Sequence, residues 1–340
     1  MAREWNRWDE EENSREGLDV RRRTLLGNLA LTVCEFRKFS FATGGALYFD
    51  GGEDFPRVGP YYHENGLFTK AHERYGDTVA EQFTRLATMV EASHAEKRRS
   101  LKERRQFRGA VWLLTELMRE FVPSFDKEIV SGERISGTKS VAEALNARFE
   151  AQHIPFVRPY HGKYLFVVRH NDFYLQNIMV TKDLGIAAIF DWDVLESVPA
   201  PVGYTAYPLW TWMDFHPHYV QRMNSEGQPA SSEEDLKRYR KWWLSSIEDI
   251  MGDHPHAADV RISHIWGAIH EVLRVCNVEG ALWVARKFMR EANAEMGGTM
   301  PVDYFLEWMG KSEHKQLDEI RQKVLTKVKE WIQAVRSGEV

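Results

Sequence analysis

Three short runs rich in β-branched and aromatic residues lie in the middle of the chain, between two long regions with helical spacing of apolar residues. The runs cover 164–169, 178–181 and 186–190, and polar loops separate them. So few strands cannot bury the apolar side chains of a chain of 340 residues that is 43% hydrophobic, so helices must form most of the core. We therefore predict an α+β fold that is mainly helical, with a small β insert that carries polar residues.

Apolar residues recur at helical spacing on both sides of this insert. We expect helices over residues 21–37, 77–106, 108–121, 140–152, 233–252, 258–276, 279–296, 301–309 and 314–336. Apolar residues and glycine pairs predict a short hairpin over 39–49. Residues 1–20 are polar and predict a loose or weakly helical lead-in to one domain over 21–340.

The charge and cysteine content exclude several classes of protein. Lys and Arg number 45 against 50 Asp and Glu, and a net charge of −5 argues against nonspecific nucleic-acid binding. Two cysteines exclude a disulfide framework and a four-cysteine zinc site. No apolar run approaches the length of a membrane span, and the charged first residues do not form a signal peptide. We expect a cytoplasmic protein with neither a nucleic-acid nor a membrane partner.

Four polar residues next to the predicted strands fit the chemistry of phosphoryl transfer. They are His170, Asp172, Asn177 and Asp191. The spacing His-x-Asp-x4-Asn is that of the protein-kinase catalytic loop, and Asp191 ends the next apolar strand. Asp172 would be the base, whereas Asn177 and Asp191 would be oxygen ligands for magnesium. His170 would brace the loop by hydrogen bonding, and the residues should meet in one cleft.

A structural interpretation of the same residues is also possible. Asp172 and Asn177 are common turn residues, and Asp191 could simply end a strand. Turn chemistry alone does not require this register over two successive segments, so we favour the catalytic interpretation.

The segments 170–180, HNDFYLQNIMV, and 189–193, IFDWD, resemble the aminoglycoside phosphotransferase and choline-kinase family. The usual forms there are His-Gly-Asp-(x)4-Asn-Ile-Leu-Val and Ile-Ile-Asp-Trp-Glu. Segments 44–49, GGALYF, and 58–60, VGP, resemble elements of a fungal branch of that family. This sequence departs from the pattern at Asn171, in place of glycine, and at Asp193, in place of glutamate.

The resemblance covers about residues 21–215 and implies a protein-kinase-like fold, mainly its helical C-terminal lobe. It implies ATP, magnesium and phosphoryl transfer to the hydroxyl of a small molecule. It also implies Asp172 as the base and Asn177 and Asp191 as metal ligands.

The sequence offers no obvious clamp for ATP. Kinase-like enzymes hold the nucleotide with a β-rich N-terminal lobe and its lysine, and the residues before 21 are too few and too polar to form five strands. The glycine pairs at 44–45 and 51–52 precede no helix, so we expect hairpin turns there and not a phosphate loop. Lys38 is a lysine candidate, but the family's order puts it in the wrong lobe. We expect weak or no ATP binding, and two alternatives stay open: a non-catalytic kinase-like protein and a truncated gene product.

Three pairs of histidines follow the insert: His216 with His218, His254 with His256, and His264 with His270. The first two pairs flank prolines and could bind a metal, but no cysteine accompanies them, and loop polarity is the preferred interpretation. The third pair lies within the predicted helix 258–276, where we expect core or flanking histidines.

Tryptophan pairs and two acidic residues are further candidates for an acceptor site. Trp210 with Trp212, and Trp242 with Trp243, could bind an amine cation through their ring faces, but helix packing explains them better. Asp214 and Glu196 could line the same site, and surface solvation explains them equally well.

Overall fold

The computed structural model describes residues 5, 15–41, 45–48, 57–59, 61–62, 68–69, 100–121, 166–192, 195–216, 231–275, 278–295, 301–311 and 315–339. The chain forms two compact units. Unit 1 comprises Met1–Tyr62, Ile135–Asp214 and Arg222–His264, and unit 2 comprises His63–Arg134, Phe215–Gln221 and Ile265–Val340. The fold is mixed α+β and mostly helical, which confirms the predicted class at that level.

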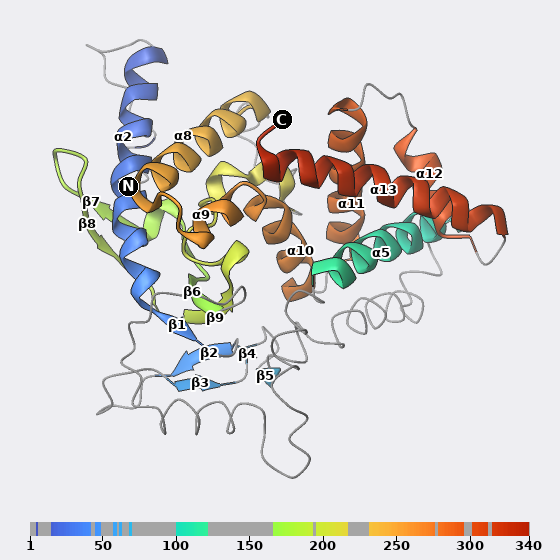
Figure 1. Ribbon diagram of the computed structural model, residues 1–340, viewed down its shortest axis with the longest axis horizontal. Coiled ribbons are helices and arrows are strands. Elements are labelled where there is room, and N and C mark those ends of the chain that lie inside the picture. Colours follow the sequence, from blue (N-terminus) through green and yellow to red (C-terminus); the bar gives the residue numbers. More distant parts are fainter. Residues whose placement is uncertain are drawn as a thin grey trace. The chain divides into compact units, whose positions relative to one another are not determined.

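A five-stranded antiparallel sheet forms one part of unit 1 (Figure 1). Its order is β1-β6-β9-β2-β3, with bounds Ser40–Phe41, Phe166–His170, Leu195–Pro199, Gly45–Tyr48 and Arg57–Gly59. The central strands β6 and β9 pair over their full length, for example Val168 with Ser197. All of β9 and the first three residues of β6 are buried, so these two strands anchor the sheet.

The predicted hairpin over 39–49 is wrong. Strand β1 pairs with β6, and β2 pairs with β9 and β3, so β6 and β9 lie between β1 and β2. The reason is that the buried strands β6 and β9 offer longer pairing edges than either short strand offers the other. The sheet therefore draws three strands from residues 40–59 and two from 166–199.

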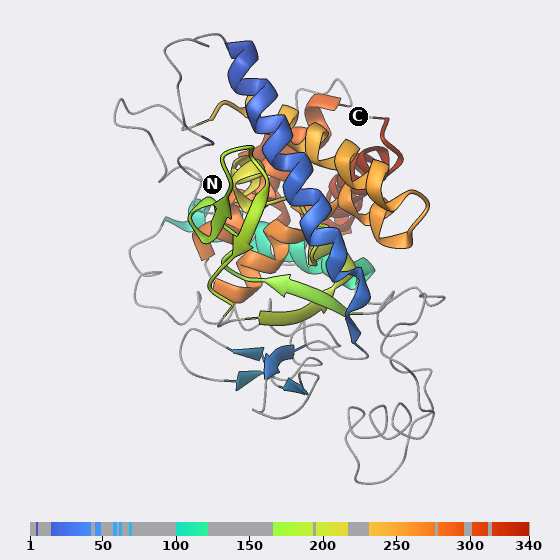
Figure 2. The ribbon, with the colours of Figure 1, turned by 90° about the vertical axis from the view of Figure 1, so that its left-hand side faces the viewer.

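A separate two-stranded hairpin follows β6. Strands β7, Ile178–Val180, and β8, Ile186–Ile189, pair in antiparallel register, with Leu184 at φ 66° in the turn between them. Asn28 of the helix α2 donates a hydrogen bond from Nδ2 to the Leu184 carbonyl at 2.9 Å. Figures 1 and 2 both show α2 lying along this hairpin.

The helices of unit 1 pack through buried apolar stripes. Helix α2 is Arg15–Cys34 and continues as the 3-10 helix η1, Glu35–Lys38, whereas α8 is Glu233–Met251 and α9 is Pro255–Val260. Helix α8 begins with a capping box between Ser232 and Asp235 and ends at Gly252, which has φ 54°. The first unit also holds β4, Tyr61–Tyr62, and the 3-10 helices η3, η4 and η5, at Leu175–Asn177, Ala200–Val202 and Leu209–Thr211.

Unit 2 is built mainly of helices. They are α5, Leu101–Phe121; most of α10, Ser263–Val275; α11, Val278–Glu295; α12, Val302–Met309; and α13, Lys315–Ser337. Strand β5, Phe68–Thr69, also belongs to this unit, and η6, Met213–Phe215, crosses the boundary between the units.

Helix α12 crosses α5 in direct backbone contact, and two glycines make this possible. A Cβ built on Gly109 would lie 2.0 Å from the Leu306 carbonyl oxygen, and one on Gly310 would lie 1.7 Å from that of Arg105. Neither glycine has a positive φ. These positions therefore require glycine because it has no side chain, and not because of its backbone conformation.

Several predicted helix bounds need correction. The expected break near residue 107 is wrong, because α5 is continuous and Phe107, 2% exposed, extends its buried stripe. The expected single helix 258–276 is two helices, since α9 ends at Val260 and α10 begins at Ser263. The first helix begins at Arg15, inside the predicted lead-in.

The remaining predicted helices after residue 230 agree with α8, α11, α12 and α13 to within one or two residues. The expected helices over 77–99 and 140–152 lie outside the described residues. Within the described part of the chain, no helix is both long and apolar enough to cross a membrane.

Candidate active site

The segment from the last residue of β6 to the start of β7 carries three of the four predicted site residues. His170 ends β6, Asp172 lies in the turn that follows, and Asn177 ends η3. Two backbone hydrogen bonds fold the loop back on itself: the Tyr174 amide donates to the Asp172 carbonyl at 2.8 Å, and the Asn177 amide donates to the Tyr174 carbonyl at 3.0 Å. The loop thus has a defined local shape that presents Asp172 and Asn177 on the same turn.

Asn177 is bonded to Asp172 through its side chain. Its Nδ2 donates to Asp172 Oδ2 at 2.7 Å and to the Asp172 backbone carbonyl at 2.9 Å. Because the amide nitrogen is committed to Asp172, the amide oxygen Oδ1 points away from this contact. The pair therefore leaves one oxygen of each side chain, Asp172 Oδ1 and Asn177 Oδ1, outside the hydrogen bonds that join them.

The β7–β8 hairpin brings the residue before Asp191 into contact with Asn177. The Phe190 amide donates to the Asn177 carbonyl at 2.8 Å, so the residue before Asp191 is fixed against the end of η3. Asp191 itself is exposed and has φ 63°, in the left-handed region. Few residues other than glycine adopt this conformation, although Asp and Asn do so more readily, and such positions concentrate at functional sites.

His170 braces the loop from the other side. Its Nε2 lies 2.7 Å from the Phe190 carbonyl oxygen, and since a carbonyl only accepts, Nε2 carries the proton. The imidazole also lies edge-on to the Trp192 ring, with centroids 4.6 Å apart, and Trp192 Nε1 donates to the Ile189 carbonyl at 2.6 Å. The histidine thus ties the end of β6 to the segment that carries Asp191, through the Phe190 carbonyl.

The four predicted residues form one connected set within unit 1. Asn177 joins Asp172 by its side chain and the Phe190–Asp191 segment by its backbone, and His170 joins that segment from β6. Sequence reasoning missed Trp192 and the backbone of Phe190 as parts of this set. The signal for Trp192 was available, because it lies between the two acidic residues of the Asp-Trp-Asp segment.

The donor set suits a hard divalent cation. Carboxylate and amide oxygens are the ligands that Mg²⁺ takes from proteins, and it usually keeps only one or two carboxylates and completes its shell with phosphate oxygens and water. In the described ranges, no group of three or more His, Cys, Asp or Glu side chains is placed to bind a metal. Asn177 and Asp191 could hold magnesium only together with oxygen atoms from a bound phosphate and water.

The other acidic candidates are structural. Asp214, 1% exposed, forms a two-pronged ion pair with Arg240, with N–O distances of 2.6 and 3.0 Å. Glu196, also 1% exposed, lies within β9. The interpretation of both as solvated surface residues is wrong, because partners and strand pairing distant in sequence bury them.

The histidine pairs also differ from expectation. His254 and His256 do not lie in a loop: Pro255 opens α9, and His254 caps it by accepting from the His256 amide at 3.2 Å. His256 is buried with Nδ1 2.9 Å from the Tyr204 hydroxyl, and burial lowers its pKa to about 4. Burial lowers the pKa of His254 as well.

Of the remaining histidines, His216, His264 and His270 are buried, the last two as predicted, and His218 lies outside the described residues. The tryptophans Trp210, Trp212 and Trp243 are buried, and Trp242 is half-buried, which agrees with helix packing. Lys38 forms an exposed ion pair with Glu35 within η1.

Comparisons of the chain with models of protein families, with curated proteins and with solved structures give no match. The function is therefore inferred from the loop and the hairpin themselves.

Proposed function

We propose that the chain is a small-molecule phosphotransferase of the kinase-like type, cytoplasmic and dependent on ATP and magnesium. The observation that carries the proposal is the connection of Asp172, Asn177 and Asp191 through Asn177. Its amide nitrogen holds Asp172, and its carbonyl fixes the residue before Asp191. Such an arrangement suits phosphoryl transfer, in which a general base and two metal ligands must lie close together.

The roles follow from the atoms that each side chain leaves outside these bonds. Asp172, held through Oδ2, can accept the proton of an acceptor hydroxyl at Oδ1 as that hydroxyl attacks the terminal phosphorus of ATP. Asn177 Oδ1 and the Asp191 carboxylate would hold magnesium, which neutralises charge on the phosphates when bound. His170 holds the strand end that aligns the two segments, through its contact from Nε2 to the Phe190 carbonyl.

Apolar surface beside the polar set suits a nucleotide base. Met179, on β7 two residues after Asn177, is 51% exposed, and Phe190, just before Asp191, is 44% exposed. Exposed large apolar side chains that flank convergent polar groups are typical of a ligand site. We assign this surface to the base of ATP.

A non-catalytic kinase-like protein is the second candidate. The observation that favours it concerns Lys38, the lysine that the sequence offers for the phosphates. It is paired with Glu35 three residues away on an exposed face. Exposed pairs of this kind contribute little energy, so the pairing weakens the case for a phosphate clamp without removing it.

Calorimetry of ATP binding with and without magnesium tests the proposal, followed by ADP release in the presence of a panel of small hydroxyl acceptors. Because no phosphate clamp is evident, we expect weak, magnesium-dependent binding that Asp191→Asn weakens further and that Asp183→Asn leaves unchanged. Asp183 is a matched control, because it lies in the turn of the same hairpin and its carboxylate accepts a hydrogen bond from Thr181 of that turn. Binding without turnover on any acceptor would favour the second candidate, and binding indifferent to Asp191→Asn would refute the metal site.

A further inference from the structure

Trp5 is a buried residue far in sequence from the elements that bury it. Its side chain is 4% exposed. The indole lies edge-on to two rings: its centroid is 5.0 Å from that of Tyr239 on α8 and 6.0 Å from that of Trp210 on η5. Edge-to-face pairs at these distances are favourable beyond the area that they bury. Trp5 thus fills a space between two elements that carry other aromatic side chains.

Arg22 of α2 fixes Trp5 in this place. Its Nε donates to the Trp5 carbonyl at 3.1 Å, and its Nη1 donates to the Tyr239 hydroxyl. The guanidinium also lies over both rings, 5.3 Å from the Trp5 centroid and 5.4 Å from that of Tyr239. A residue held by its backbone, its ring face and its ring edges has one defined orientation.

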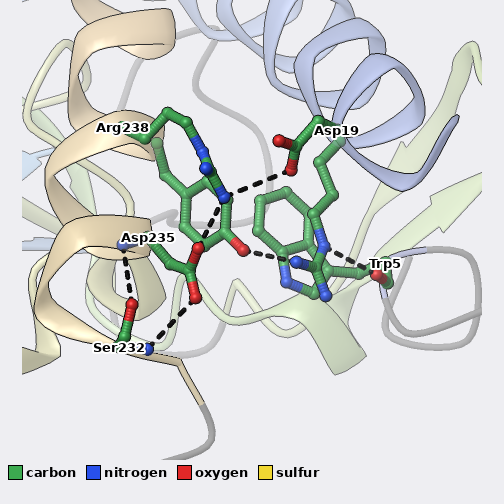
Figure 3. Close-up of polar contacts among 7 residues, drawn as sticks. Trp5, Asp19, Ser232, Asp235 and Arg238 are labelled. Carbon is green, nitrogen blue, oxygen red and sulfur yellow. Dashed lines mark hydrogen bonds and ion pairs between the residues drawn. The ribbon is translucent and has the colours of Figure 1, made fainter. Parts of the chain in front are cut away.

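Polar contacts close to Trp5 join α2 to α8 (Figure 3). Arg238 bonds both Asp19 of α2 and Asp235 of its own helix, and Ser232 and Asp235 form the capping box of α8. The two helices that hold Trp5 are therefore linked independently of it, so they can keep their places when Trp5 is replaced.

The aromatic contacts continue from Trp5 to the catalytic loop. The Trp210 centroid is 6.0 Å from that of Phe173, and the Phe173 centroid is 6.0 Å from that of His170. Phe173 directly follows Asp172 and is part of the loop that ends at Asn177. Trp210 therefore neighbours both Trp5 and a residue of the loop.

The backbone that carries Trp210 is fixed from α8. Arg240 donates from Nη1 to the carbonyl of Thr211, the next residue, at 2.9 Å, and its guanidinium pairs with buried Asp214. With its backbone held, the Trp210 side chain can shift only where its ring neighbours leave space. Loss of the Trp5 ring would open space beside Trp210.

We propose that Trp5 is a positioning residue for the Asp172–Asn177 loop. By filling the space between Tyr239 and Trp210, it keeps Trp210 against Phe173 and so holds the loop in the conformation that bonds Asn177 to Asp172. The consequence of this positioning for catalysis rests on the proposed phosphotransferase function, but the structural effect of Trp5 on the loop does not. The competing explanation is that Trp5 only covers apolar surface between α2 and α8.

Amide hydrogen exchange of the full-length chain separates the two explanations. The reporters are the amides of Tyr174, Asn177 and Phe190, which make the hydrogen bonds that shape the site. Trp5→Ala should raise their exchange rates about tenfold or more, whereas Trp5→Phe, which restores a ring, should stay close to the wild type. The matched control is Trp242→Ala, because Trp242 contacts Tyr239 in the same cluster and, within the described part of the chain, has no ring contact with Phe173.

Faster exchange of the loop in Trp5→Ala alone supports the proposal. Loop rates equal to the wild type, with changes confined to α2 and α8, overturn it, and so do equal increases in Trp5→Ala and Trp242→Ala, which would indicate general loosening. If circular dichroism shows that Trp5→Ala is unfolded, Trp5→Leu takes its place under the same criteria. Exchange is measured without substrate, so a chain without phosphotransferase activity leaves this test intact.

Discussion

The Asp172–Asn177 loop of unit 1 and the α5–α12 contact of unit 2 are held by opposite means. The loop is half-buried, and its shape comes from hydrogen bonds between specific polar atoms. The helix contact depends on atoms that are missing, since Gly109 and Gly310 let backbone touch backbone. The loop depends on the chemical identity of its side chains, and the helix contact depends on the small size of the two glycines. Substitutions in the loop should therefore change reactivity with little effect on stability, and substitutions at the glycines should do the reverse.

The largest expected effect is on turnover in the loop. Asp172→Asn keeps the size of the side chain and removes its basicity, so the rate of phosphoryl transfer should fall by about 10²–10⁴. The midpoint of urea unfolding should stay close to that of the wild type. Steady-state kinetics and urea titration measure the two quantities, and a rate that is unchanged would remove Asp172 from the mechanism.

The next largest effect is on the stability of the helix contact. Gly109→Ala places a methyl group 2.0 Å from the Leu306 carbonyl oxygen, and backbone must move to relieve it. We expect a loss of about 3 kcal/mol in the free energy of unfolding, at the upper end for overpacking. Exchange of α5 and α12 amides should locate the damage there.

Gly27→Ala is the matched control for that substitution. Gly27 is also within a helix, α2, and its added Cβ would meet only Ser246 Oγ at 3.6 Å. This variant should be as stable as the wild type or more stable by about 0.5–1 kcal/mol, because alanine restricts the unfolded chain and favours the helix. Equal losses in the two variants would show that the contact of Gly109 with the Leu306 backbone does not explain the first result.

The third effect is a pH dependence of stability. It arises from a buried polar residue, in contrast to the half-exposed residues of the loop. Burial lowers the pKa of His256 to about 4, so the unfolded chain binds a proton at this residue between pH 6.5 and 4 and the folded chain does not. Stability from this residue is therefore present above pH 6.5 and is lost as the pH falls, by about 2 kcal/mol between pH 7 and pH 5. Urea titrations at both pH values should show this loss in the wild type and a smaller one in His256→Gln. An equal loss in both would assign the acid sensitivity to other groups.

The smallest effect concerns the backbone of Asp191. A left-handed φ of 63° costs alanine about 1 kcal/mol and glycine nothing. Asp191→Gly should thus be more stable than Asp191→Ala by about that amount, although both should lose magnesium-dependent binding. Thermal unfolding of the two variants checks the difference, and Asp191→Ala as stable as Asp191→Gly would mean that the turn relaxes at no cost.

Much of the candidate site was predictable because its parts are close in sequence. Asp172 and Asn177 are separated by one turn of chain, and short strands with clear β propensity carry Asp191 to them. The contact of His170 with the Phe190 carbonyl was not predictable, since a backbone acceptor leaves no mark in the sequence. The helices α8, α11, α12 and α13 were predictable from their apolar periodicity, whereas the break between α9 and α10 was not.

The sheet and the buried polar residues were not predictable in the same way. Strands as short as Ser40–Phe41 carry too few side chains to specify a partner, so their neighbours follow from the whole fold. Asp214 and Glu196 look like surface residues until their distant contacts are known. Trp5 gave no sign of burial, because its partners Trp210 and Tyr239 lie in remote segments.

The strand order of the five-stranded sheet also determines when each strand can pair during protein synthesis. Phe41 pairs with Phe166, and Ala46 pairs with Glu196, so strands made early must wait for partners made much later. At ribosomal rates of roughly 5–20 residues per second, that delay is on the order of ten seconds. During it, the backbone of β1 and β2 lacks the central strands that pair with it in the finished protein. In the interval between the emergence of β2 and that of β9, the unpaired edges of these strands expose the nascent chain to aggregation.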